Sequence, residues 1–318
     1  MVWKRFGSGY KEAILESSIF LAPALILAVQ MSGKGFSHSF QVGGTDGLSF
    51  IWVIAVALVF KFAIVDGLAR YTPAKGESIF SSLPDLPGPR HWGIWVVIGI
   101  YTFELMAYSS IALFAASVLD ELLPGEQTVS VIAILIVITV LVMLLWRSLG
   151  FLERTVYFII AVVILLMAYT LVATVVFGSS ASLVHGPGWA SLVDDFMLLV
   201  GSGSGLALLL YSEWVGEKIK RVPAGMSRPK VLAGLRTSLV FAFLITGVFS
   251  LIIMTVAASA GTGDMADMNG MELGGLPMAV PAFIMSVGIL MFGILYVGID
   301  GRARAISRML RRLGSLRW

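Results

Sequence analysis

The sequence contains no cysteine and only three histidines, and just 13% of its 318 residues are charged. Without cysteine the chain can form neither a disulfide nor a thiolate metal site. No histidine pair stands at metal-binding spacing, and no serine–histidine arrangement suggests nucleophilic catalysis. No Gly-x-x-x-x-Gly-Lys loop for ATP is present either. We therefore expect a protein that is not an enzyme and has no cofactor.

Apolar residues are abundant instead, at 58% of the chain. A soluble domain of this length would need far more polar surface. Several apolar runs reach the roughly 20 residues that cross a bilayer as a helix, and they are too uniform for barrel strands. The sequence thus predicts an all-α transmembrane bundle of about eight helices. Their approximate cores are Ser17–Met31, Phe50–Leu68, Trp92–Val118, Val129–Trp146, Tyr157–Phe177, Phe196–Trp214, Ser238–Ala258 and Val280–Ile299.

Basic residues alternate along the chain. They occur at the amino terminus and in every second connection, with six between Lys218 and Arg236 and six more between Arg302 and Arg317. The alternate connections carry acids, and only Lys34 is a base near them. The positive-inside rule then places both termini in the cytoplasm, which an even helix count also requires, and indicates the cell membrane. The bases face anionic lipid in this interpretation, so the expected partner is the bilayer and not nucleic acid.

Glycines interrupt two of the predicted helices. The first runs apolar to Met31 and continues Ser32-Gly33-Lys34-Gly35, while the sixth contains Gly201-Ser202-Gly203-Ser204-Gly205. Glycine costs a helix about 1 kcal/mol relative to alanine, so such clusters favour local unwinding. Paired breaks in two halves indicate a transporter binding site, and a spacing of five helices matches a five-plus-five inverted repeat. In the sixth helix, the same small residues are also typical of close helix packing.

We predict that the two breaks form a midplane site for a small ion, bound by backbone carbonyls and serine hydroxyls. Lys34 would repel a cation placed beside it. Its ammonium group either replaces a coupling cation, meets an anionic substrate or extends to the interface. The candidate substrate-binding residues are Ser32, Gly33, Lys34, Gly35, Gly201, Ser202, Gly203 and Ser204.

Four ionisable residues fall within apolar segments, where charge is costly and by default indicates function. Lys61 and Asp66 are five residues apart and should point to different sides of one helix. Glu104 is the deepest acid, and it either relays protons or accepts hydrogen bonds in the bundle. Glu213 precedes Trp214 at the expected cytoplasmic end, which predicts a solvated or interfacial side chain.

Several motifs occur in an informative order along the whole chain. They are Gly43-Gly44-Thr45-Asp46-Gly47-Leu48-Ser49-Phe50-Ile51-Trp52, Leu149-Gly150-Phe151-Leu152-Glu153-Arg154, Tyr211-Ser212-Glu213-Trp214-Val215 and Gly298-Ile299-Asp300-Gly301. Together they resemble the Nramp family of proton-coupled divalent-metal transporters, and more closely its divergent Nramp-like relatives. The resemblance implies a leucine-transporter-type inverted repeat and metal-ion symport.

The chain departs from that family at the metal site. Counted back from Gly43, the family's Asp-Pro-Gly-Asn motif falls on Ser32-Gly33-Lys34-Gly35, so both side-chain ligands are missing. The Met-Pro-His stretch of the sixth helix falls near Ser204-Gly205-Leu206, so the sulfur ligand is missing too. Oxygen atoms could still bind a hard ion, but a transition metal would lose its preferred ligands. The metal is therefore left unknown.

The resemblance also sets the expected domain organisation. One membrane domain would contain a first repeat over about 10–178, a partial second repeat over about 190–300 and a basic cytoplasmic tail over 301–318. The second repeat would hold three helices where the family has five, which indicates a shortened protein, a fragment or helices supplied by a partner. The leading prediction is a secondary transporter. The alternative is a non-transporting scaffold or partner subunit derived from one, acting in a homo-oligomer or a complex.

Overall fold

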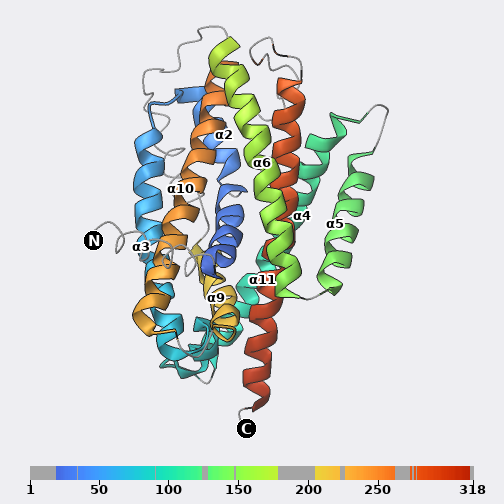
Figure 1. The fold of residues 1–318 in the computed structure, drawn as a ribbon. Coiled ribbons are helices and arrows are strands. Elements are labelled where there is room, and N and C mark those ends of the chain that lie inside the picture. The colour runs from blue at the N-terminus through green and yellow to red at the C-terminus, as the bar shows by residue number, and fades with distance from the viewer. Residues whose placement is uncertain are drawn as a thin grey trace, which may run out of the picture.

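The regular elements in the described part of the chain are helices (Figure 1). The computed structural model describes residues 19–33, 35–89, 91–123, 128–146, 148–177, 205–222, 226–261, 273, 276 and 278–315. In chain order the helices are Ile19–Gly33, α2 (Phe36–Asp46), α3 (Ile51–Lys75), the 3-10 helix η1 (Ile79–Asp85), α4 (Trp92–Asp120), α5 (Val129–Leu145), α6 (Leu149–Phe177), α8 (Gly205–Leu209), α9 (Tyr211–Ile219), α10 (Arg228–Ala260) and α11 (Ala279–Ser315).

The length and composition of these helices are those of an integral membrane protein. Five described helices are long and apolar enough to span a bilayer, or six if Ile19–Gly33 and α2 form one bent span. All eight predicted segments have a helical counterpart, although the sixth is described only from Gly205. The predicted all-α transmembrane bundle is therefore confirmed.

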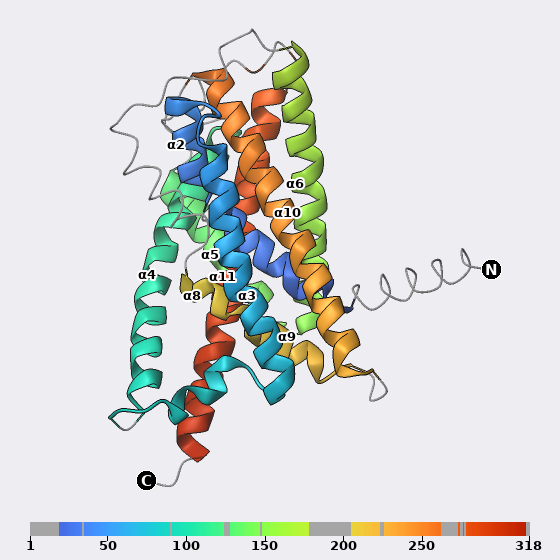
Figure 2. The ribbon, with the colours of Figure 1, turned by 90° about the vertical axis from the view of Figure 1, so that its left-hand side faces the viewer.

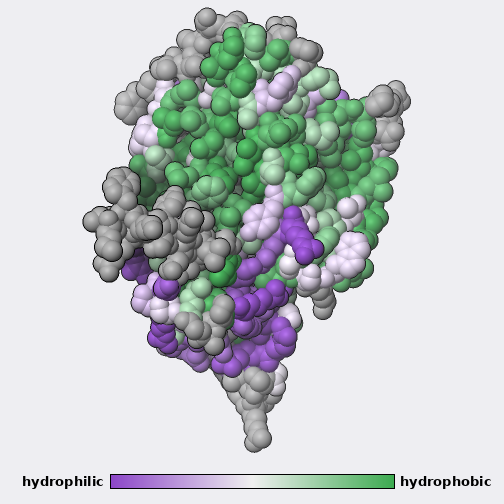
Figure 3. All heavy atoms as spheres, viewed as in Figure 1, coloured by the Kyte–Doolittle hydropathy of each residue, from purple (hydrophilic) through white to green (hydrophobic). Residues whose placement is uncertain are grey.

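The outer faces of the helices are apolar. Phe60 on α3 is 65% exposed, Phe103 on α4 73% and Phe158 on α6 68%. Figure 3 shows a wide hydrophobic surface above a hydrophilic patch near the lower end of the molecule. Large exposed apolar surfaces are unfavourable in water, so these faces are the ones that lipid covers.

The helix Ile19–Gly33 forms the centre of the bundle. Apart from Leu21, every residue between Phe20 and Gly33 is buried. Figures 1 and 2 show this helix and α2, in blue, surrounded by α3, α6, α10 and α11. Helices α10 and α11 are also mostly buried, with 61% and 72% of their most apolar windows inside the protein. The interior is thus built from the first, seventh and eighth predicted segments.

Successive helices run in opposite directions. Helices α3, α5 and α11 finish at one end of the bundle, where α4, α6 and α10 begin (Figures 1 and 2). We call this the basic end, because the described connections there contain the clustered lysines and arginines of the sequence. The alternation of charge predicted from the sequence therefore corresponds to two chemically different ends of one bundle.

The last helix extends beyond its predicted boundary. The sequence predicted an apolar segment ending near Ile299 and then a basic tail, whereas α11 continues to Ser315. Ala305 and Met309 are fully buried in this extension, and the side chain of Arg302 is 0% exposed. The helix continues because these residues, spaced three to four apart, keep one face against the bundle.

Candidate functional site

The first membrane segment bends where glycines were predicted to interrupt it. Its two parts, Ile19–Gly33 and α2, meet at 47°. The Gly35 N–H donates to the Met31 carbonyl and the Ser39 N–H to the Gly35 carbonyl, both over 3.0 Å. Helical hydrogen bonding therefore resumes directly on both sides of the bend, and the interruption is a kink. Lys34 lies outside the described residues.

Neutral polar groups lie buried beside the kink. Gln30 is 0% exposed and Ser32 1% exposed. The Gln30 Oε1 atom and the Ser32 Oγ atom have no hydrogen-bond partner among the described residues. A Cβ atom on Gly33 would overlap Ile294 of α11, so glycine is what allows α11 to approach the kink. Since buried polar atoms are costly when unpaired, these two oxygens are candidate ligand contacts.

The partner half of the predicted site is not described. Gly201, Ser202, Gly203 and Ser204 lie outside the described residues, and α8 begins directly after them at Gly205. Their contribution to a binding site stays a prediction. Among the residues that the structure does describe, no three His, Cys, Asp or Glu side chains are grouped to hold a metal ion.

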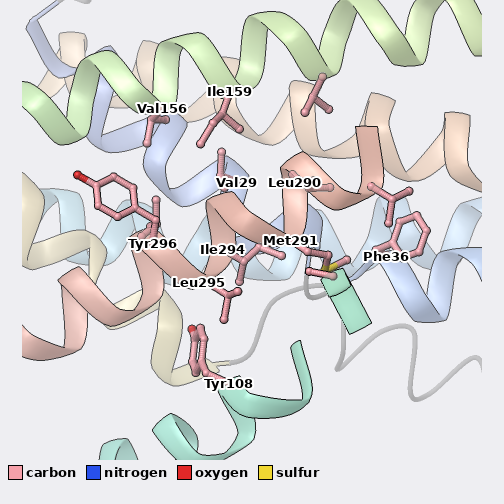
Figure 4. Packing of buried hydrophobic residues seen from close by; sticks show 14 of the residues in the cluster. Val29, Phe36, Tyr108, Val156, Ile159, Leu290, Met291, Ile294, Leu295 and Tyr296 are labelled. Atoms are coloured by element: carbon pink, nitrogen blue, oxygen red, sulfur yellow. The ribbon is translucent and has the colours of Figure 1, made fainter. Parts of the chain in front are cut away.

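A buried network connects the first helix with α4 and α11. Gln30 Nε2 donates to Tyr108 Oη over 2.7 Å, and Arg302 Nη1 donates to the same oxygen over 2.6 Å. Arg302 also donates through Nη1 to the Gly298 carbonyl, at 3.0 Å, and through Nε to Glu104 Oε2, at 2.8 Å. Figure 4 shows Tyr108 extending from α4 toward α11. We call Gln30, Glu104, Tyr108 and Arg302 the Arg302 network.

Aromatic rings complete the surroundings of this guanidinium. It lies 4.7 Å from the ring centroid of Tyr108 and 5.3 Å from that of Tyr101. Cation–π contacts of this kind are worth about 2 kcal/mol or more when desolvated. Arg302 is therefore held by a carboxylate, a hydroxyl, a carbonyl and two rings. Of the two roles predicted for Glu104, the contacts show the hydrogen-bonding one directly.

A second buried network lies nearer the basic end. Arg308 Nε donates to Glu213 Oε2 over 2.9 Å, and Arg308 Nη2 to Glu217 Oε1 over 2.8 Å. Ser78 Oγ donates to the other Glu213 oxygen at 2.5 Å. Glu213 is 0% exposed, so the prediction of a solvated or interfacial side chain is wrong. The helical extension of α11 supplies Arg308, which covers the carboxylate together with Ser78.

Glu217 is the more exposed acid of this second network. Burial raises the pKa of its carboxyl, but the hydrogen bond and charge of Lys220 and the nearby Arg308 outweigh that effect. The net result is a pKa below the usual value of 4.5. Glu217 is consequently ionised at neutral pH and bridges α9 to α11.

The other two predicted charges belong to a different part of the bundle. Asp66 on α3 is paired with Arg70 at 2.5 Å and with Arg236 of α10 at 3.2 Å. Both arginine side chains are well exposed, at 60% and 58%. Lys61 is buried one and a half turns earlier on α3. Asp66, Arg70 and Arg236 form what we call the Asp66 cluster, which is separate from the two networks on α11 that contain Glu104 and Glu213.

Sequence reasoning missed Gln30 and Tyr108, and it assigned Arg302 and Arg308 to a tail. A signal existed for Tyr108, which follows Glu104 by four residues and so shares its helix face. Gln30 was detectable as the amide nearest the glycine cluster in an otherwise apolar run. Nothing local distinguishes Arg302 from the solvated bases that follow it, because its partners are about 200 residues away in sequence.

Comparisons with known proteins bear on the fold. No protein-family model and no curated protein matches the chain. One similar solved structure is that of the transporter MHP1, of the nucleobase-cation-symport-1 family, in a closed conformation with bromovinylhydantoin bound. It matches with a TM-score of 0.64 and 14% sequence identity. The match covers 94% of this chain and 72% of MHP1. A manganese transporter of Eremococcus coleocola with an aromatic bis-isothiourea compound matches with a TM-score of 0.62 and 14% identity, covering 95% and 67%.

The chain has the leucine-transporter-type fold. A mutant form of the manganese transporter matches as well, with a TM-score of 0.57 and 13% identity over 94% of this chain. This chain spans 66% of the length of that transporter. The predicted division into a first repeat and a partial second repeat stays a prediction.

Proposed function

We propose that the protein is an Nramp-like secondary transporter that moves a small ion across the cell membrane with proton coupling. The observation that carries the proposal is the first helix, which is buried along its length and bends at its glycines inside a leucine-transporter-type bundle. Broken helices at membrane depth are tolerated where they line a cavity or are enclosed by protein. In such folds they supply the substrate site.

The groups beside the kink favour a hard ion or small polar solute over a transition metal. Gln30 Oε1 and Ser32 Oγ are neutral oxygens without a hydrogen-bond partner among the described residues, whereas the one sulfur in the described part of the kink is the thioether of Met31. Hard cations are bound by carbonyl, amide and hydroxyl oxygens, whereas transition metals prefer imidazole and sulfur. The manganese transporter and MHP1, which was solved with an organic ligand, show that similar folds serve unlike substrates.

The Arg302 network provides a physical route for coupling the site to the basic end. Gln30 beside the kink contacts Tyr108, Tyr108 contacts Arg302, and Arg302 holds Glu104. A change at the kink that moves Gln30 would disturb the pairing of Glu104. In this proposal Glu104 exchanges protons only when Arg302 withdraws, and the basic end faces the cytoplasm, as the positive-inside rule requires.

Uptake by reconstituted protein tests the proposal. Proteoliposomes would be offered manganese, iron, magnesium and small anions, with and without a proton gradient. The expected result is saturable, gradient-dependent uptake of one of them. Gly33→Leu should abolish it, because the new side chain would overlap Ile294. The matched control is Gly67→Leu on the open face of α3, where a Cβ atom has no neighbour within 4 Å and uptake should persist.

The alternative is a scaffold or partner subunit that does not transport. Failure of folded wild-type protein to take up any solute on the panel would contradict the transporter proposal. Co-purification of a stoichiometric membrane partner in the same experiment would favour the alternative. Equal loss of uptake in Gly33→Leu and Gly67→Leu would also argue against a site at the kink.

A further inference from the structure

A hollow of about 660 Å³ lies between α5 and α11 at the basic end. Its two walls differ in chemistry. One wall is formed by aliphatic side chains of α5, and the other by polar and charged side chains of α11 with Glu217 of α9. The principal lining residues are Ile138, Leu141, Leu145, Arg304, Arg308 and Arg311.

The aliphatic wall is open to the surroundings of the bundle. Ile138 is 50% exposed, Leu141 52% and Leu145 78%, so α5 turns a continuous apolar stripe outward. Trp146 follows at the end of α5 and is 63% exposed. Exposed tryptophans are typical of the boundary between hydrocarbon and headgroups. The hollow therefore spans the depth at which an acyl chain joins its headgroup.

The charged wall lies on one face of α11, with its arginines at a spacing of four and three residues. Arg304 pairs with Asp300 at 2.7 Å, and Arg308 pairs with Glu213 and Glu217. Arg311 differs, since its one hydrogen bond within the described part of the chain goes to the Ser307 carbonyl of its own helix, at 3.3 Å. Arg311 is thus the arginine of this wall that has no carboxylate partner among the described residues.

An adjoining hollow of about 460 Å³ increases the positive charge. It shares Glu217, Arg308 and Arg311 with the first and adds Lys220, Arg312 and Glu77. Together the two hollows contain five basic side chains against three acidic ones. Figure 3 shows a hydrophilic patch near the lower end of the molecule directly beside apolar surface. An anion bound at Arg311 would meet a net positive surface on one side and an apolar groove on the other.

We propose that this hollow binds one anionic phospholipid, with the phosphate on Arg311 and an acyl chain along α5. Basic pockets between membrane helices on the cytoplasmic side are suited to anionic headgroups. A free phosphate would use Arg311 but not the aliphatic wall, so the shape of the hollow favours the lipid. The site is separate from the kink and does not depend on transport.

Native mass spectrometry of delipidated protein in neutral detergent tests this assignment. Phosphatidylglycerol is titrated against phosphatidylcholine of the same acyl chains, and one phosphatidylglycerol should bind preferentially. Arg311→Gln should weaken that binding about fivefold, the effect of about one basic side chain near a lipid surface. Arg221→Gln is the matched control, with the same charge change at an exposed position of the basic end outside the hollow, and should leave binding unchanged.

A second variant separates lipid from free phosphate. Leu141→Ser should weaken phosphatidylglycerol binding, because the acyl chain loses an apolar contact that a free phosphate would not make. Equal loss in Arg311→Gln and Arg221→Gln would overturn the proposal, because it would show only general attraction to the basic end. Equal binding of the two lipids, or displacement of the lipid by millimolar inorganic phosphate, would overturn it as well. Thermal unfolding of each variant confirms that the protein tested is folded.

Discussion

The Arg302 network and the Asp66 cluster use the same ion-pair chemistry, but their arginines lie at very different depths. The Arg302 network joins the first helix, α4 and α11, and its guanidinium is fully buried. The Asp66 cluster joins α3 to α10 through Arg236, and its two arginines are more than half exposed. Removing the fully buried guanidinium leaves Glu104 without its cation in a medium of low dielectric constant. Asp66 is also buried, but it keeps one arginine when the other is removed, and each of these arginines is largely in contact with water. The two clusters should therefore differ in cost although their distances are similar.

The largest effect is expected from removing the interior cation. Arg302→Gln should lower the free energy of unfolding by about 3–5 kcal/mol, because a fully buried set of cation contacts is lost and Glu104, only 19% exposed, is left without its partner. Chemical unfolding in detergent micelles measures the change. Adding Glu104→Gln should recover part of the loss, since the pair acts as a unit. A loss below about 1 kcal/mol would show that Arg302 contributes no more to stability than the exposed arginines do, which would contradict the expected difference between the two clusters.

Two glycines allow the packing of the interior to be compared with that of the outer surface. A Cβ atom at Gly43 of α2 would lie 2.6 Å from the Met254 carbonyl oxygen of α10, which is backbone and cannot easily move. Gly43→Ala should destabilise by about 1–3 kcal/mol, the usual cost of overpacking. Gly67→Ala on the open face of α3 is the control and should be neutral or stabilise by up to about 1 kcal/mol. Equal effects at the two positions in the same unfolding measurement would contradict the close approach of α2 and α10.

A smaller effect is expected in the Asp66 cluster. Arg236→Gln should change the free energy of unfolding by about 0–1 kcal/mol, because its guanidinium is 58% exposed and Arg70 still pairs with Asp66. The change should shrink further in high salt, which screens exposed charges. A loss comparable with that of Arg302→Gln, independent of salt, would refute the distinction between the clusters.

The smallest effect concerns pH at Glu217. Because its pKa is lower in the folded protein than the usual 4.5, its ion pairs stabilise the fold above that value. The contribution disappears as the pH falls through the lower folded pKa. The stability difference between wild type and Glu217→Gln should therefore be present at pH 7 and shrink below about pH 4. A difference that is constant over this range would show that Glu217 acts by packing alone.

The membrane fold was predictable because its causes are local. Each apolar run is long enough to form a spanning helix by itself, and the glycines after Met31 mark the 47° kink. The position of the basic residues at one end of the bundle also follows from the sequence, because they occur in every second connection between the predicted helices. The placement of Glu213 was not predictable, since its burial depends on Arg308, 95 residues away in sequence, and on Ser78.

By itself, the sequence determined the helices, the position of the first break and the chemical difference between the two ends. These depend on hydrophobicity, backbone entropy and charge within a few turns of chain. Only the tertiary structure decided that Arg302 is an interior residue and that Gln30, Tyr108 and Glu104 converge on it. It also decided that Arg311 borders an apolar groove of α5. Such pairings join segments far apart along the chain, and they arise because a buried charge is stable only where packing provides its partner.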